Sequence, residues 1–451
     1  MTESARHDRR ADITTERLAA LHEGFQTNPV ARLVQNAVTQ TTADDVALNR
    51  DVVTGTDFTF STRLDDWKVT NQKKSGRCWM FAALNLLRVG AMEKMGLKNF
   101  EFSQNYTLFW DKFERSNYFL EEIIASGERH VDDRLVAFLL GEPLSDGGQW
   151  NMAVNIIRKH GLVPKSAMPE TESSSSTRRM NTILKYKLRE GARTLRDAIQ
   201  SGQDTDAVRA RKHGILEEVW RVLCIHLGTP PTQFDWQWHD KDQNFHRDGV
   251  MTPQEFAAKY VDLPLEDYVC LVHDPRPENP YGQTYTVQSL GNVVGGAPVV
   301  YLNVEMDFMK SVTQKLLEGG TPVWFGCDVG KQMRSDKGLW DAKVFDFESL
   351  YQAEFSLTKA ERLHYHQTLM THAMLFTGVD VVNGQPRRWR VENSWGEERG
   401  RNGFYTMNDS WFDEYMFEIA APRELLPPEL QAALSGTPKV LSAWDPMGAL
   451  A

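Results

Sequence analysis

The sequence predicts an α+β protein in which a helical half packs against a β-rich half. Three observations support this prediction. Residues 79–95 are apolar almost all round and long enough to form a buried helix. Charged sequence of helical character fills much of the middle of the chain. The final third instead contains short runs typical of strands, separated by turn residues.

The first half of the chain supplies the helical elements of this prediction. Residues 1–60 begin polar, and we expect them to be part helix and part arm. Gly96 follows the apolar segment, where a helix commonly stops. A polar, glycine-containing loop precedes that segment, so Cys78 should lie at the helix N-terminus. Residues 171–177 are rich in Ser and Thr, which predicts an exposed loop.

Helix signals continue beyond this loop before the strands begin. Residues 178–227 are charged and helical in pattern. Thr252 with Glu255, and Thr358 with Glu361, form two capping-box pairs, each of which predicts a helix start. The strand-like runs of the last third are residues 373–382, 387–393 and 403–407.

Composition and charge are those of an ordinary globular protein. Hydrophobic residues make up 41% of the chain and charged residues 25%. The formal net charge of −10 argues against a general affinity for nucleic acid. No apolar run approaches the length of a membrane span, and the N-terminus lacks the apolar segment of a secretory signal. We therefore expect a cytosolic protein without a membrane anchor.

The four cysteines are too scattered to form a disulfide scaffold or a CxxC motif; they are Cys78, Cys224, Cys270 and Cys327. A reducing cytosol would keep a reactive thiol free. Only Cys78 lies in a motif, and we expect the other three to be structural. His364, His366 and His372 lack further residues that would complete a metal site, so we predict no metal and no cofactor.

Four residues could together perform nucleophilic catalysis. The helix dipole and a neighbouring imidazolium would lower the pKa of the Cys78 thiol. His372 opens an apolar strand and could exchange the thiol proton, while Asn393 ends another strand and could orient the imidazole. Gln72 lies six residues before Cys78, close enough to share an oxyanion site with the Cys78 backbone N–H.

These residues resemble the signature blocks of the papain-like cysteine peptidases. The blocks are Gln72 with Cys78-Trp79, His372-Ala373, and Asn393-Ser394-Trp395-Gly396, in the order of that family. His372 follows Cys78 by 294 residues, which implies a large insertion. Five further segments are similar to the bleomycin hydrolase and aminopeptidase C branch: FQTNPVARL, TNQKKSGRCWMFA, GGQWNM, DKDQNFHRDGVMTPQEF and AWDPMGALA.

The resemblance implies a papain-like fold with a helical half, a β-barrel-like half, large helical insertions and a C-terminal arm in the active-site cleft. The corresponding segments are an N-terminal arm, a helical half with the nucleophile, a mostly helical insertion, a β-rich half and a C-terminal arm. Their expected bounds are 1–60, 61–170, 171–290, 291–435 and 436–451.

The resemblance also implies roles for residues outside the predicted triad. Trp395 would shield the hydrogen bond between His372 and Asn393 from water. Gly147 and Gly148 would pair with the substrate backbone, where a side chain would obstruct close approach. The free carboxylate of Ala451 would pair with the α-ammonium of the substrate, so that the arm converts an endopeptidase cleft into an aminopeptidase cleft.

The activity implied is that of a cytosolic thiol aminopeptidase that also hydrolyses the amide of bleomycin. Similar enzymes form rings of six subunits, which implies a homohexamer. Two alternatives remain open: a ring-shaped nucleic-acid-binding protein, and another Cys-His-Asn acyl-transfer enzyme. The acidic net charge argues against the first. The Ser-Trp-Gly block and the arm favour a peptidase over the second.

Overall fold

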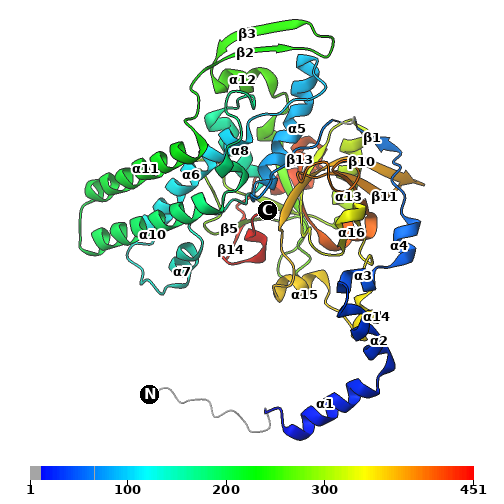
Figure 1. The fold of residues 1–451 in the computed structure, drawn as a ribbon. Helices are drawn as coiled ribbons and strands as arrows, with labels where there is room; N and C mark the ends of the chain where they lie inside the picture. The colour runs from blue at the N-terminus through cyan, green and yellow to red at the C-terminus, as the bar shows by residue number, and fades with distance from the viewer. Residues whose placement is uncertain (1–11, 65–66) are drawn as a thin grey trace. The chain divides into compact units, whose positions relative to one another are not determined.

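The computed structural model describes residues 12–64 and 67–451 (Figure 1). The chain divides into two compact units. The first contains the described residues up to Asp57 together with Ala342–Ser356. The second contains the rest, Phe58–Asp341 and Leu357–Ala451. All of the predicted site residues belong to the second unit.

The first unit is a chain of short capped helices. Its helices are α1 (Thr15–Thr27), α2 (Pro29–Val38), α3 (Ala43–Ala47), α4 (Arg50–Gly55) and α14 (Phe347–Tyr351). The Asn28 carboxamide accepts hydrogen bonds from the first turn of α2, and Pro29 occupies the first helical position. Helix α1 buries none of its residues, and Leu18 and Leu21 are exposed. This unit therefore presents apolar side chains that its own residues do not cover.

Helix α5 (Cys78–Met95) lies at the centre of the second unit. It begins at Cys78 and ends at Gly96, whose φ of 63° is the left-handed conformation that glycine adopts easily. Both features confirm the predictions from the sequence. The helix packs against the neighbouring helix α8 (Trp150–His160) and against strands β7 (Val323–Cys327) and β10 (His372–Val382). Buried contacts on both sides explain its continuous apolar sequence.

The remaining helices of the helical half gather on one side of α5 (Figure 1). They are α6 (Gln104–Ala125), α7 (Arg134–Gly141), α9 (Glu172–Ser175), α10 (Arg178–Gln200), α11 (Thr205–Leu227) and α12 (Pro253–Tyr260). The predicted helical block 178–227 is α10 and α11, and the capping box of Thr252 and Glu255 begins α12. Strands β2 (Phe234–His239) and β3 (Phe245–Met251) form a separate hairpin.

The prediction that residues 171–177 form an exposed loop is wrong. Thr171 and Ser174 form a reciprocal capping box that begins α9, and both Ser174 and Thr177 are buried. The hydroxyl groups that suggest a solvated loop are instead used to hydrogen-bond the local backbone. This compact segment lies against the loop before Cys78, because the Lys74 backbone N–H donates to the Ser175 carbonyl.

The β half is built on one large mixed sheet. In sheet order its strands are β14, β5, β6, β4, β13, β7, β10, β11, β12, β9 and β8, with β1 added to β10. The bounds not yet given are β1 (Thr62–Arg63), β4 (Tyr268–Val272), β5 (Thr284–Val287), β6 (Tyr301–Asn303), β8 (Met333–Arg334), β9 (Leu339–Trp340), β11 (Gln385–Glu392), β12 (Phe404–Asn408), β13 (Met416–Pro422) and β14 (Lys439–Leu441).

Helices cover this sheet on the side away from α5. They include α13 (Met306–Glu318), α16 (Asp409–Tyr415) and α17 (Pro428–Ala433). Helix α15 (Lys359–His364) instead buries Leu363 in the core that contains α5. Phe376 on β10 stacks on Phe412 of α16 in the resulting core. Since β10 is covered on both faces, it is a continuous apolar strand, and His372 at its first position is held rigidly. The predicted α+β architecture with a helical half and a β half is confirmed.

Short helices and the C-terminal segment complete the unit. The 3₁₀ helices are η2 (Leu265–Asp267), η3 (Ser335–Lys337), η4 (Arg423–Leu425) and η5 (Pro446–Gly448). Strand β14 joins the edge of the large sheet, and the chain then turns inward through η5. The C-terminus thus lies between the helical half and the sheet (Figure 1).

Candidate active site

Cys78 is the first residue of α5, and the residue before it is held firmly. The Arg77 guanidinium donates two hydrogen bonds to the Glu170 carboxylate, at 3.0 and 2.7 Å, and a third to the Ser75 hydroxyl at 2.9 Å. Arg77 is fully buried, and such paired hydrogen bonds fix its plane. The backbone that carries Cys78 is therefore set by a buried ion pair as well as by the helix.

His372 and Asn393 lie on neighbouring parts of the sheet, at the start of β10 and just after β11. The His372 Nε2 atom is 2.9 Å from the Asn393 Oδ1 atom. The Trp395 ring lies 4.9 Å from the imidazole, centroid to centroid, and the His372 side chain is buried. When Nε2 donates to Asn393, the Nδ1 atom is left as a proton acceptor.

The Cys78 thiol lies where α5 packs against the first residues of β10. The backbone N–H of Ala373, next to His372, hydrogen-bonds the Cys78 thiol. The backbone N–H groups of Cys78 and Trp79 also point to the sulfur, as expected at a helix N-terminus. Cys78 and the residue that follows His372 are therefore neighbours in space, although they are far apart in the sequence.

The predicted lowering of the Cys78 pKa is wrong for this state of the protein. Burial raises the pKa of the Cys78 thiol to about 11, although the three backbone N–H groups oppose that rise. Burial also lowers the pKa of His372 to about 4, and the hydrogen bond to Asn393 offsets only part of this effect. Both groups are thus neutral near pH 7, because desolvation outweighs the helix terminus.

Gln72 is joined to the Asn393 block through backbone and side chain. Its backbone N–H donates to the Ser394 carbonyl at 2.8 Å. Its side-chain carbonyl accepts from the Ser394 hydroxyl at 2.5 Å, and its Nε2 atom donates to the Ser75 carbonyl at 2.6 Å. Because a carboxamide nitrogen carries two hydrogens, one of them remains for an oxyanion. Ser394 is a site residue whose role the sequence analysis did not assign.

Gly147 and Gly148 contact the last two residues of the chain. A Cβ atom on Gly148 would lie 2.4 Å from the Trp79 ring, and one on Gly147 would lie 2.7 Å from an oxygen of the terminal Ala451 carboxylate. Side chains at either position would therefore clash. The Trp79 indole N–H donates to the Asp146 carbonyl at 2.7 Å, which fixes the glycine pair beside the start of α5.

The last residue of the chain pairs with Gly148 as a short antiparallel strand would. The Gly148 N–H donates to one oxygen of the terminal Ala451 carboxylate at 3.1 Å, and the Ala451 N–H donates to the Gly148 carbonyl at 3.3 Å. The Gln149 carboxamide holds the Ala449 carbonyl at 2.6 Å. Ala451 is buried, and its carboxylate makes no ion pair with the residues described in the structure. The end of the arm is thus held against Gly147 and Gly148, and Gly148 lies beside the ring of Trp79, the residue after Cys78.

Two further contacts fix the arm before it enters the cleft. The Arg276 guanidinium binds the Asp445 carboxylate through two hydrogen bonds, at 3.0 and 2.8 Å. The Tyr301 hydroxyl donates to the Met447 carbonyl at 3.0 Å. Neither Arg276 nor Tyr301 lies in a motif that the sequence analysis singled out, and their partners are more than 140 positions away. Sequence alone therefore contains no local signal for them.

A buried carboxylate connects the helical half to the strand that ends at Asn393. Glu392, the last residue of β11, accepts hydrogen bonds from the Trp67 indole at 2.5 Å, the Asn85 carboxamide at 3.0 Å and the Arg88 guanidinium at 2.7 Å. Asn85 and Arg88 belong to α5, and Glu392 is 2% exposed. The network holds the nucleophile helix against the strand that positions Asn393.

We expect Glu392→Ala to lower the free energy of unfolding by about 3–5 kcal/mol, because Arg88 would remain buried without its partner. Glu392→Gln is the matched control, since it keeps the shape and one acceptor oxygen for the buried donors, and it should cost less. Urea unfolding followed by circular dichroism measures both. A loss below about 1 kcal/mol for Glu392→Ala would contradict this role of the network.

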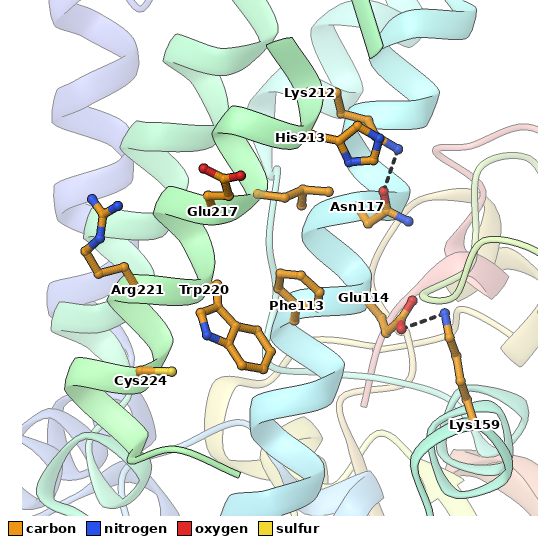
Figure 2. Close-up of a pocket in the computed structure, with 11 residues that line it drawn as sticks. Phe113, Glu114, Asn117, Lys159, Lys212, His213, Glu217, Trp220, Arg221 and Cys224 are labelled. Carbon is orange, nitrogen blue, oxygen red and sulfur yellow. Dashed lines mark hydrogen bonds and ion pairs between the residues drawn. The ribbon is translucent and has the colours of Figure 1, made fainter. Parts of the chain in front are cut away.

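A cavity in the helical half lies away from these residues. It has a volume of about 800 Å³ and lies between α6 and α11, where Phe113, Trp220 and Cys224 form its wall (Figure 2). Figure 2 also shows charged groups along its edge, including the Glu114–Lys159 ion pair. None of the predicted site residues lines this cavity. Cys224 therefore has no contact that relates it to the predicted triad.

Residues 12–64 and 67–451 contain no group of three or more His, Cys, Asp or Glu side chains placed to hold a metal ion. No helix within the same residues is long and apolar enough to cross a membrane.

Comparison with known proteins covers nearly the whole chain. The sequence model of the Peptidase C1-like family matches residues 12–448. Bleomycin hydrolase of Homo sapiens is 43% identical over 449 residues, which are 97% of this chain and 99% of that protein. Aminopeptidase C of Lactococcus lactis subsp. lactis is 44% identical over 444 residues, which are 97% of this chain and 100% of that protein.

A solved structure agrees with the fold described above. The crystal structure of PepW from Lactobacillus rhamnosis superposes with a TM-score of 0.96 at 45% sequence identity. The match covers 98% of this chain and 100% of that chain. The helical half, the large sheet and the C-terminal segment are therefore shared between the two proteins.

Proposed function

Because the chain belongs to the Peptidase C1-like family of papain-like cysteine peptidases, we propose that it is a cysteine aminopeptidase that removes residues from the amino ends of peptides. The observation that carries this proposal is the pairing of Ala451 with Gly148 next to Cys78. A cleft that is filled on one side of the nucleophile by the chain's own carboxyl end leaves room for only a short amino-terminal part of a substrate.

The proposed chemistry begins with transfer of the Cys78 proton to His372 as the sulfur attacks the scissile carbonyl. The Cys78 Sγ–carbon bond forms, and the carbonyl oxygen takes the negative charge. His372 then donates its proton to the leaving amine, which gives an acyl-enzyme that water hydrolyses. Asn393 keeps the imidazole oriented by accepting from Nε2, and Trp395 covers that hydrogen bond.

Gln72 and the backbone N–H of Cys78 are the proposed oxyanion donors. The contacts of Gln72 with Ser75 and Ser394 support this role, because they fix its carboxamide while one N–H remains unused. A preorganised donor costs no reorganisation when the oxyanion forms, and loss of one such donor lowers kcat about 10²–10³-fold.

The arm would set the length of the substrate that binds. The N–H and carbonyl of Gly148 are the backbone partners that an extended substrate would use, and Ala451 already occupies both. The carboxylate of Ala451 has no cationic partner among the described residues, so it is available to the α-ammonium of a substrate. An N-blocked peptide lacks that charge and is excluded by the arm.

The relatives and the surface support four finer proposals. The relative named bleomycin hydrolase supports a related amide hydrolysis by this enzyme. The uncovered apolar face of α1 supports assembly with further copies of the chain, and we propose a homohexamer. We also propose a cytosolic enzyme that needs no cofactor, since four free cysteines suit a reducing compartment.

The pH at which kcat/KM falls to half on the acid side should lie far below the ordinary pKa of histidine. His372 must be neutral to accept the thiol proton, and burial lowers its pKa from 6.5 to about 4. Activity should therefore stay level from pH 7.5 to about 5 and fall as the pH drops through about 4. Initial rates on an aminoacyl coumarin amide from pH 3 to 7.5 measure this, with circular dichroism to verify folding. A midpoint at pH 6 or above would contradict the prediction.

The proposed function is tested with a leucyl coumarin amide and its N-acetylated twin. We expect thiol-dependent release of coumarin from the free-amine substrate and none from the acetylated one. Equal rates on both would show an endopeptidase-like cleft and contradict the proposed role of the arm. Transfer of the leucyl group to an added amine in preference to water would favour an acyl-transfer enzyme instead.

A further inference from the structure

A polar cavity of about 610 Å³ opens between the loop before Cys78 and the start of α10. Its lining is largely polar and charged: Lys73, Lys74, Ser75, Gly76, Asp146, Thr177, Arg178, Asn181, Thr182 and Lys185. This cavity is distinct from the one between α6 and α11. No role has been given above to its basic side chains.

The position of this cavity relates it to the first residue of a substrate. Gly76 stands two positions before Cys78, and Asp146 stands directly before Gly147. The Gly76 N–H donates to the Asp146 carboxylate at 3.2 Å, so the loop before Cys78 and the segment before Gly147 lie together at the cavity. The proposed function places the first residue of a substrate between Ala451, which pairs with Gly148, and Cys78. The cavity adjoins that place through Gly76 and Asp146, which lie close to Cys78 and Gly147 in the chain.

The charges that line the cavity are predominantly positive. Four of its side chains are cationic, and Asp146 is its one carboxylate. The Asp146 carboxylate is already satisfied: it pairs with Lys112 at 2.5 Å and accepts from Thr177 at 2.5 Å and Asn181 at 2.7 Å. These partners hold the pKa of Asp146 well below its usual range, against the effect of burial.

Three of the four cations lack a carboxylate partner. Lys185 forms an ion pair with Glu142, at the edge of the cavity. In contrast, Lys73, Lys74 and Arg178 make no ion pair with any residue that the structure describes, and all three are exposed. Their position is maintained by the backbone, since the Lys74 N–H is bonded to the Ser175 carbonyl at 2.9 Å. An anionic group in the cavity would meet unneutralised charge.

We propose that this cavity selects substrates whose first residue has an acidic side chain, with Lys73, Lys74 and Arg178 as the residues that determine the selectivity. The proposal rests on the proposed aminopeptidase function and adds a substrate class to it. Aspartate and glutamate at the amino end are favoured, and lysine and arginine are repelled. Because each exposed pair contributes modestly, we expect a preference of about tenfold for a glutamyl over a glutaminyl substrate.

The test compares two substrates of nearly identical shape, a glutamyl and a glutaminyl coumarin amide. The ratio of their kcat/KM values should be about ten in the wild type and fall to about one or below in a Lys73→Gln, Lys74→Gln, Arg178→Gln triple variant. Lys98→Gln is the matched control, since it removes an exposed positive charge outside the cavity and should leave the ratio unchanged. The wild-type ratio should also fall as sodium chloride is raised from 20 to 500 mM, because salt screens exposed charges. Over this range the Debye length shortens from about 20 Å to about 4 Å.

A binding measurement separates this proposal from the proposed function. Isothermal titration of Cys78→Ala protein with the dipeptides Glu-Ala and Gln-Ala reports the preference without turnover. Tighter binding of Glu-Ala that is lost in the triple variant supports the proposal even when no amide is hydrolysed. Equal affinities, or a wild-type ratio that the triple variant leaves unchanged, overturn it, although hydrolysis of free-amine substrates would still support an aminopeptidase.

Discussion

Cys78→Ala is expected to lower kcat on an aminoacyl coumarin amide at least about 10⁴-fold. The substitution removes the sulfur that would form the acyl-enzyme, while the hydrogen bond between His372 and Asn393 stays in place. Substrate binding should persist, because the cleft, the glycine pair and the arm do not depend on the thiol. A kinetic assay with enzyme in excess over substrate measures the residual rate.

The control for this experiment is another cysteine of the same chain. Cys224 is half-buried in the wall of the cavity between α6 and α11 and touches none of the predicted site residues. Cys224→Ala should therefore keep kcat within about twofold of the wild type. Full activity of Cys78→Ala would remove the basis of the proposed mechanism, and a large loss in Cys224→Ala would assign the reactive thiol to a different place.

Removal of the last four residues, 448–451, is expected to create activity on the N-acetylated substrate. The truncation frees the N–H and carbonyl of Gly148, which Ala451 occupies. Two backbone hydrogen bonds at about 1 kcal/mol each, plus contacts of the newly opened cleft, correspond to a rise of about 100-fold in kcat/KM. The free-amine substrate should lose about 10–100-fold, because it loses the carboxylate that pairs with its ammonium.

A full-length variant tests whether the arm must be held in position, and not only be present, to exclude the blocked substrate. Asp445→Asn weakens the paired hydrogen bonds with Arg276 while all residues of the arm remain. Partial activity on the blocked substrate is expected, between that of the wild type and that of the truncated enzyme. If truncation leaves the blocked substrate untouched although the protein is folded, the arm does not set the substrate length.

The parts of the fold that the sequence predicted well are those with strong local signals. Helix α5 was predicted because its apolar run is long and Gly96 can adopt a positive φ at its end. The capping boxes at Thr252 and Thr358 mark helix starts that the structure contains. Local chemistry was misleading at 171–177, where the same hydroxyl groups that favour a loop instead cap a short helix.

Electrostatics and long-range contacts were beyond prediction from the sequence. The position of Cys78 at a helix N-terminus was correct, but the direction of its pKa shift depends on burial, which the motif does not determine. The contacts of Ser394 with Gln72, and of Tyr301 with the arm, join residues that are far apart in the sequence. The bounds of the five expected segments stay predictions. The segment 171–290, expected to be mostly helical, also contains the strands β2 to β5.

The most direct test of the central claim is covalent labelling of the nucleophile. The protein is treated with leucine chloromethyl ketone, whose amine is free, and in parallel with its N-acetylated form, and labelled peptides are identified by mass spectrometry. The account predicts one label per chain from the free-amine reagent, on Cys78, with Cys224, Cys270 and Cys327 unmodified and little reaction of the acetylated form. Labelling at another cysteine, or equal labelling by both reagents, would contradict it.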